Sequence, residues 1–296
     1  MASPLPSSLA ARVLLAVVLV GAALTGAATL PAAASPAAMR ALGQCRASLP
    51  TLEHVPGVLT VATERPSNWP WFIDDRPANG RGYESALVYA IAKSLGVARR
   101  DVHWVQQPYA TATAPGAKSF DFDADEIVQP ASASTAVTYS SAYYDLHTAL
   151  VTRPDSRIAT HHDAAALRTY RYGALVGSVE LSYLQRSLHP RRAPQAFTSV
   201  SSLLVALRTG TVDAIALDTA SALSLVHTPA HASGAALAIV GQFSGVSGHF
   251  ALVFQHRNPL AACVDESLAL LRGNGTLSAL QRRWLAPFAA VPTLQP

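Results

Sequence analysis

Residues 120–144, FDFDADEIVQPASASTAVTYSSAYY, carry more structural information than any other stretch of this chain. Asp121 stands at the opening of the stretch, and the run YSSAYY over residues 139–144 closes it. Acidic residues fill its first half, whereas residues 130–135, PASAST, carry no positive charge. A site built on this stretch therefore has no cationic side chain of its own.

Strand and helix patterns alternate on both sides of this stretch. Gly57–Thr63 is a short run rich in β-branched residues and predicts a strand. Tyr83–Leu95 places its apolar residues on one helical stripe, and Gly96 provides a left-handed stop. This alternation predicts an α/β architecture with mostly parallel sheets. Further strands are expected over 102–105, 172–176, 213–217, 236–240 and 249–254, and further helices from about 179 and over 199–208, 264–271 and 277–285.

The order and spacing of several motifs resemble the family 3 extracellular solute-binding proteins, the receptors of amino-acid ABC importers. The resemblance covers roughly Val58 to Leu285. It implies two α/β lobes of the type II periplasmic-binding-protein fold, with two crossover strands as the hinge and the ligand between the lobes. Besides residues 120–144, the matching pieces are Gly80–Glu84 with Ile91–Gly96, Gly210–Ala214 with Asp218, and Asn274–Leu277 with Trp284–Leu285.

The same resemblance implies how the chain divides into lobes. Lobe one is expected to comprise residues 48–145 and 241–290, and lobe two, inserted between them, residues 146–240. Before them we expect a signal peptide over residues 1–34 and a flexible lead over residues 35–47. An uncleaved membrane anchor is the alternative for the first segment, and in either case the protein is expected outside the cytoplasm.

The family arginine that grips the ligand's α-carboxylate corresponds to Ala133 in this chain. A ligand carboxylate would then be buried without its main partner. Arg65, Arg76 or Arg81, in loops of lobe one, are candidates to replace it. Two outcomes stay open: an altered specificity, or a degenerate receptor that no longer binds a small molecule tightly.

The resemblance also assigns residues that contact ligand. Asp218 corresponds to the acid that accepts the ligand's α-ammonium, although an N-cap of the following helix is an equally open role for it. Ser178 corresponds to a ligand contact of lobe two. Trp69 or Trp71, together with Tyr109, match positions where aromatic rings stack on the ligand.

Three further acids, Glu64, Asp125 and Glu126, correspond to positions near the cleft. Carboxylates and aromatic rings without an arginine suit a cation such as a quaternary or polyamine-like ammonium. No histidine or cysteine spacing predicts a metal site, and no motif predicts a cofactor.

The expected export of the protein decides which oxidation state we expect for its two cysteines. In an oxidising compartment Cys45 and Cys263 are expected to form a disulfide, with two independent thiols as the alternative. The chain has 296 residues and a formal net charge of +4, and its arginine pairs are isolated, which argues against nucleic-acid binding.

The leading functional hypothesis is a secreted, monomeric solute-binding protein that captures a small polar ligand, either amino-acid-like or a cationic amine. It would deliver this ligand to an ABC permease or report it to a membrane sensor. One alternative is a protein-interaction module or sensor that needs no ligand. The other is a dehydratase-like enzyme on the same fold, and the sequence favours a protein that is not an enzyme.

Overall fold

The computed structural model describes residues 36–130, 132, 134–227 and 236–295. The predicted signal peptide, residues 1–34, and Ala133 lie outside these described residues. Among the helices in the described ranges, none is long and apolar enough to cross a membrane.

The first sheet is built around β1 (Leu59–Thr63), whose five residues are all buried. β1 pairs in parallel with β2 (Val102–Gln106) and β3 (Phe122–Asp123). On the far side of β3, β10 (Val253–Gln255) runs antiparallel to both β3 and β4 (Val137–Tyr139). The order in the described chain is β2-β1-β3-β10-β4.

The second sheet is built around β5 (Tyr144–Thr152), which runs antiparallel to both of its neighbours. Its order in the described chain is β11-β9-β5-β8-β6-β7. The two parallel pairs on the other side of β8 carry the α/β crossover pattern that the sequence predicted. The remaining strands are β6 (Tyr172–Leu175), β7 (Gln195–Phe197), β8 (Ala214–Asp218), β9 (Ala238–Phe250) and β11 (Thr293–Leu294).

The predicted α/β class is confirmed, but both sheets are mixed rather than mostly parallel. The reason lies in the path of the chain between the two sheets. The chain enters the second sheet on β5 and leaves it on β9, so these two strands lie side by side and antiparallel. The predicted lobe boundaries, 145/146 and 240/241, fall within these two strands.

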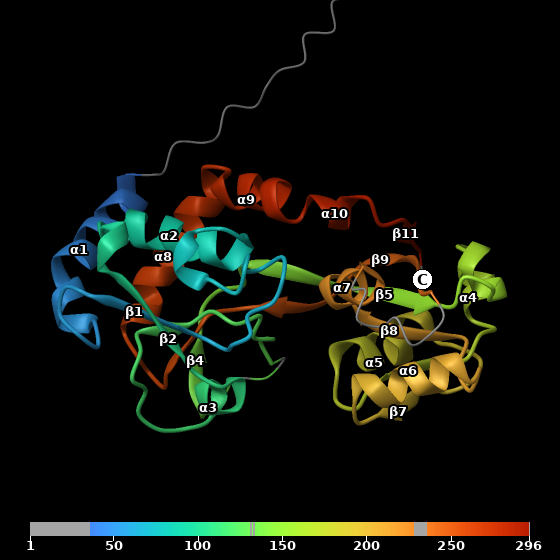
Figure 1. The fold of residues 1–296 in the computed structure, drawn as a ribbon. Helices are drawn as coiled ribbons and strands as arrows, with labels where there is room; N and C mark the ends of the chain where they lie inside the picture. The colour runs from blue at the N-terminus through green and yellow to red at the C-terminus, as the bar shows by residue number, and fades with distance from the viewer. Residues whose placement is uncertain (1–35, 131, 133, 228–235, 296) are drawn as a thin grey trace, which may run out of the picture. The chain divides into compact units, whose positions relative to one another are not determined.

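β5 and β9 also tie the second sheet to the first. The Gln129 N–H donates to the His249 carbonyl at 2.9 Å, and the Ala251 N–H donates to the Ile127 carbonyl at 3.0 Å. The sequence did not predict a further connection, between the C-terminal end of the chain and the second sheet. After α9 (Thr276–Trp284) and α10 (Ala286–Ala289) the chain returns to the second sheet, where β11 pairs in parallel with β9 (Figure 1).

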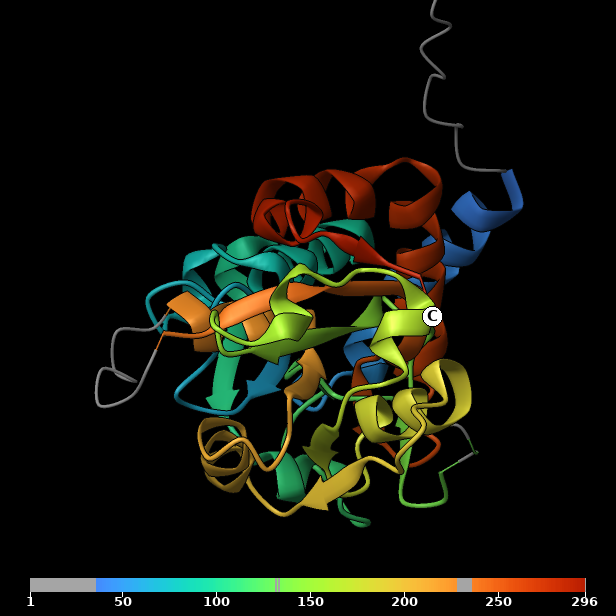
Figure 2. The ribbon, with the colours of Figure 1, turned by 90° about the vertical axis from the view of Figure 1, so that its right-hand side faces the viewer.

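Helices pack on the first sheet, and their buried side chains form with it the largest apolar cluster of the described chain. α2 (Tyr83–Leu95) begins at Gly82, where a Cβ would collide with the backbone of Trp71 and φ is +101°. α2 ends at Gly96 as predicted. The C-terminal helices α8 (Leu260–Gly273) and α9 (Thr276–Trp284), in red, lie beside the teal α2 in Figure 2.

Helices pack on both faces of the second sheet, because alternate residues of β8 point to opposite faces. Ala214 and Ala216 pack with α5 (Val179–Tyr183) and η4 (Leu184–Leu188), whereas Ile215 and Leu217 pack with α6 (Val200–Arg208) and α7 (Thr219–His227). The shorter helical elements are η1 (Pro77–Asn79), η2 (Arg99–Asp101), α3 (Tyr109–Thr113), η3 (Arg157–Thr160), α4 (Ala164–Leu167) and α10 (Ala286–Ala289).

The expectation of a flexible lead over residues 35–47 was wrong. Residues 36–52 form helix α1 (Pro36–Leu52). Leu42, Cys45 and Leu49 are buried at helical spacing and pack into the cluster that contains α2 and α8. Cys45 is joined to Cys263 of α8 by a disulfide across 218 residues of sequence. An amphipathic stripe and a covalent bond therefore fix a segment whose Ala/Pro composition suggested a loose chain.

Reduction of the disulfide is expected to destabilise the protein by about 2–5 kcal/mol, because it frees a long loop in the unfolded chain. Denaturant unfolding with and without dithiothreitol measures this. The double variant Cys45→Ala/Cys263→Ala is the control, since it should already be destabilised and should not respond to the reductant. An equal midpoint for oxidised and reduced wild type would show that the bond contributes nothing.

Candidate functional site

Two adjoining pockets lie between segments that follow strands of the first sheet and residues of the second sheet and its helices. The aliphatic pocket, of about 290 Å³, is lined by Asn68, Trp69, Glu126, Leu175, Glu180, Val200, Ala216, Leu217, Asp218, Ala220, Ser221, Ser224 and Leu225. The aromatic pocket, of about 370 Å³, is lined by Tyr109, Glu126, Val128, Leu146, Gly177, Ser178, Val179, Glu180, Asp218 and Phe250.

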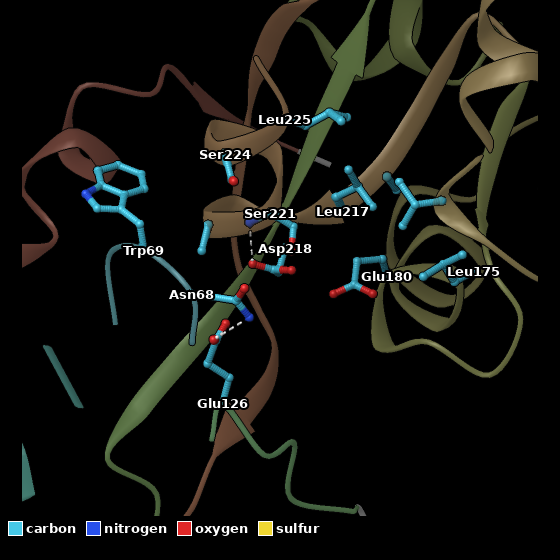
Figure 3. Close-up of a pocket in the computed structure, with 13 residues that line it drawn as sticks. Asn68, Trp69, Glu126, Leu175, Glu180, Leu217, Asp218, Ser221, Ser224 and Leu225 are labelled. Atoms are coloured by element: carbon cyan, nitrogen blue, oxygen red, sulfur yellow. Dashed lines mark hydrogen bonds between the residues drawn. The ribbon is translucent and has the colours of Figure 1, made fainter. Parts of the chain in front are cut away.

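The residues common to both pockets are three carboxylates, Glu126, Glu180 and Asp218. Glu126 follows β3, Glu180 lies in the first turn of α5, and Asp218 ends β8. Figure 3 shows the three carboxylates around one part of the cleft, with Trp69 on one side and leucines on the other. The junction of the two pockets therefore gathers three acidic side chains.

Asp218 lies where it can serve both roles that the sequence left open, the helix N-cap and the ligand contact. Its carboxylate accepts the backbone N–H of Ser221 at 3.0 Å and so supports the start of α7. It also lines both pockets. Its charge disfavours ionisation of the neighbouring acids and, after burial, is a cause of the raised pKa of Glu180, about 7.

Glu126 is held from behind by a second, deeply buried acid. Its backbone has a φ of +53°, in the left-handed region that non-glycine residues rarely adopt. Its N–H donates to Oε1 of Glu84 at 2.8 Å, and the hydroxyl of Tyr143 donates to the same oxygen. The Glu126 side chain accepts from Nδ2 of Asn68 at 3.1 Å. Glu84 thus positions Glu126, and burial raises the pKa of both carboxyls.

Two further acids lie on the same stretch of chain. Asp125 accepts the Thr63 hydroxyl at 3.3 Å, and burial raises its pKa to about 7. Neither oxygen of Asp123 has a hydrogen-bond partner among the described residues, and burial raises its pKa well above the usual range. No ion pair within the described chain joins an arginine, lysine or histidine to any of these cleft acids.

None of the three arginines considered as substitutes for the missing anchor lines either pocket. Arg65 pairs with Asp75 at 2.8 Å and Arg81 pairs with Asp74 at 2.9 Å, both on the surface. Arg76 is exposed. Among the described residues, the lining contains no cationic side chain.

The predicted aromatic residues separate into two groups. Trp69 lines the aliphatic pocket and is 44% exposed, and Tyr109 lines the aromatic pocket and is 40% exposed. Trp71, however, is fully buried and makes edge contacts with Tyr144 and Phe250, so its assignment as a ligand contact was wrong. It belongs to the core.

Of the other predicted residues, Ser178 lines the aromatic pocket and caps α5 by accepting the Leu181 N–H at 3.1 Å. Asp125 is buried behind the cleft and lines neither pocket. Glu64 is exposed and also lines neither pocket.

Sequence reasoning missed Glu180, Asn68 and Glu84. The only sequence signal for Glu180 is its place two residues after Ser178, where an acid is explained equally well by the helix dipole. Among the described residues, no group of histidine, cysteine or acidic side chains is arranged to hold a metal ion.

A comparison with models of known families matches residues 59–287 to the bacterial extracellular solute-binding proteins, family 3. The chain belongs to this family. A comparison with curated protein sequences gives no match.

Solved structures share the fold of this family 3 solute-binding protein. An ancestral arginine-binding protein bound to arginine has 22% identity and a TM-score of 0.54, over 77% of this chain and 98% of that one. ArtJ, an arginine-, lysine-, histidine-binding protein from Geobacillus stearothermophilus, has 16% identity and a TM-score of 0.51, over 79% and 96%. An ancestral amino-acid-binding protein described as a precursor of cyclohexadienyl dehydratase has 18% identity and a TM-score of 0.53, over 81% and 98%.

The buried acids predict how the stability of this solute-binding protein depends on pH. Asp125 and Glu180, each with a pKa of about 7 in the folded protein, bind protons more tightly there than in the unfolded chain. Their contribution is therefore complete only below about pH 4, the ordinary pKa of an unfolded carboxyl, and is lost as the pH rises to 8, by up to about 1.4 kcal/mol per group and pH unit.

Denaturant unfolding of the ligand-free protein at pH 5, 6, 7 and 8 measures this loss. Glu180→Gln should flatten the decline, because a neutral amide no longer titrates. Asp155→Asn, at a side chain that is 81% exposed, is the matched control and should keep the full decline. A stability that stays constant or rises between pH 5 and 8 would contradict the assignment.

Proposed function

We propose that this family 3 solute-binding protein captures a small, positively charged polar solute, amino-acid-like or an amine, and delivers it to an ABC importer. The observation that carries the proposal is the junction of the two pockets, where Glu126, Glu180 and Asp218 meet and where the described residues supply no lining cation. A cation is the ligand group that such a surface stabilises.

The physical reason lies in desolvation. Closure of the two lobes removes water from the cleft, and a carboxylate that loses water needs a cation or several donors. In the described chain Glu126 receives one side-chain donor, Asn68, and Asp218 receives one backbone donor, Ser221. An ammonium or guanidinium group would supply the missing charge and donors together.

The exposed aromatic rings support the same ligand charge. Trp69 and Tyr109 keep about two fifths of their surface exposed while lining the two pockets. A cation over an aromatic face gains about 0.5–2 kcal/mol, and more as water is excluded. Two of the similar structures are described as binding arginine or arginine, lysine and histidine, which agrees with a cationic ligand.

Family membership supports the cellular role. Family 3 proteins are extracellular solute-binding proteins, and we propose that this one acts outside the cytoplasm as a monomer, with an ABC permease as its partner. We propose capture rather than catalysis, since the similar structures are described chiefly as binding proteins.

Thermal unfolding with a panel of small solutes tests the proposal. Arginine, lysine, putrescine and tetramethylammonium represent cations, and glutamate and aspartate are acidic controls. A ligand at about a hundredfold excess over its dissociation constant adds about 2.7 kcal/mol of stability. At least one cation should raise the melting temperature, and the acidic solutes should not. Stabilisation by the acidic solutes alone, or by none of the panel, would contradict the proposal.

Asp218→Asn ties the same result to the cleft. The amide oxygen can still accept the Ser221 N–H, so the fold is retained while the charge is lost. The affinity for the stabilising cation should fall by at least about tenfold, whereas Asp155→Asn should leave it unchanged. Equal affinities for both variants would remove Asp218 from the site.

A further inference from the structure

We propose that the ligand is a secondary, tertiary or quaternary amine without a carboxylate, whose cationic nitrogen carries apolar substituents on more than one side. This inference rests on the proposed capture of a cation by the same cleft. It concerns where the charge of that cation lies within its molecule.

The position of the carboxylates is the first step. Glu126, Glu180 and Asp218 are the residues that the two pockets share, so the anionic surface lies at the junction and not at either end. Burial and the charges of Glu84 and Asp218 raise the pKa of Glu126, and burial and the charge of Asp218 raise the pKa of Glu180. Asp218 therefore lies within electrostatic reach of both glutamates. One cationic centre at the junction can therefore interact with all three.

The aliphatic pocket provides the first apolar wall. Beyond the carboxylates, Leu175, Leu217 and Leu225 lie on the side away from Trp69 (Figure 3). Val200 of α6 also lines this pocket. Within the described residues, none of these side chains offers a donor or acceptor. A hydrocarbon substituent fits this side of the junction, whereas a second charged group would be desolvated there without a partner.

The aromatic pocket provides the second apolar wall. Beyond the carboxylates, it is lined mainly by Tyr109, Val128, Leu146 and Phe250. The hydroxyl of Ser178 already accepts the Leu181 N–H as the cap of α5. A second hydrocarbon substituent fits here, with the Tyr109 ring available to the cation or to the substituent.

Two other cation classes fit less well. A linear diamine carries its charges at both ends and would place them against the apolar walls. A cationic amino acid brings a carboxylate, and the described lining has no arginine, lysine or histidine to receive it. A cationic nitrogen with hydrocarbon substituents on both sides matches the arrangement of the cleft, in which the carboxylates lie between two apolar walls.

Titration calorimetry of the full protein with four probes tests the inference. Di-n-butylamine and n-octylamine are isomers that differ in the position of the nitrogen, 1,8-diaminooctane carries two terminal charges, and arginine carries a carboxylate. Di-n-butylamine should bind at least about tenfold more tightly than the other three. Equal or tighter binding of any other probe would overturn the inference while the proposed capture of a cation stands. Failure of all four probes to bind would overturn the proposed function with it.

Two variants of helix α6 tie the preference to the aliphatic wall. Val200→Ser removes one methyl group of the lining and replaces the other with a hydroxyl, and should weaken di-n-butylamine binding by at least about fourfold. Val205→Ser is the matched control, because Val205 lies on the same helix, is 57% exposed and does not line the pocket. Equal affinities of the two variants would overturn the placement of a substituent against Val200.

Discussion

A carboxylate that is removed from water must be neutralised or supplied with hydrogen-bond donors, and this requirement shapes the whole cleft. Glu84 is fully buried, and one of its carboxylate oxygens lacks a partner among the described residues. Its other oxygen receives the Tyr143 hydroxyl and the Glu126 N–H. Proton binding, reflected in the raised pKa of Glu84, relieves the remaining cost in the absence of ligand.

The fold makes this arrangement possible because β5 and β9 bring the two sheets together next to these acids. Tyr143 precedes β5 directly, and its N–H donates to the carbonyl of Phe250, the last residue of β9, at 3.0 Å. Val128, two residues after Glu126, forms an isolated bridge with Phe250. The connecting strands thus hold Glu126 and its supporting groups beside the acids of the second sheet, and movement at the strands would alter the distance between the two sets of charges.

The sequence predicted elements whose signals are local. Helix 83–95 with its stop at Gly96 is one example, since stripe and glycine lie within fourteen consecutive residues. It could not separate Trp69 from Trp71, because both flank Pro70. Their directions are set by distant contacts, such as the Tyr83 N–H that donates to the Pro70 carbonyl at 3.1 Å. Glu180 was missed for the same reason: only the tertiary structure brings it to Asp218.

The predicted strands also show where local signals end. Residues 236–240 and 249–254 were expected as separate strands, whereas β9 runs unbroken from Ala238 to Phe250 and β10 begins at Val253. The glycines at 241 and 245 lie inside β9, where the neighbouring chain approaches closely. A Cβ at Gly241 would meet the Pro292 carbonyl, and one at Gly245 would meet the Tyr183 hydroxyl.

The most direct test of the central claim is the proton balance of binding. The cleft acids are partly protonated without ligand, with the pKa of Glu180 at about 7, and a bound cation favours their ionised form. Titration calorimetry with di-n-butylamine at pH 6.5, in buffers of different ionisation enthalpy, measures the protons exchanged. The amine itself stays protonated at this pH, so release of protons on binding is predicted to come from the protein. Binding without proton release, or with proton uptake, would contradict the claim that the cation meets the buried carboxylates.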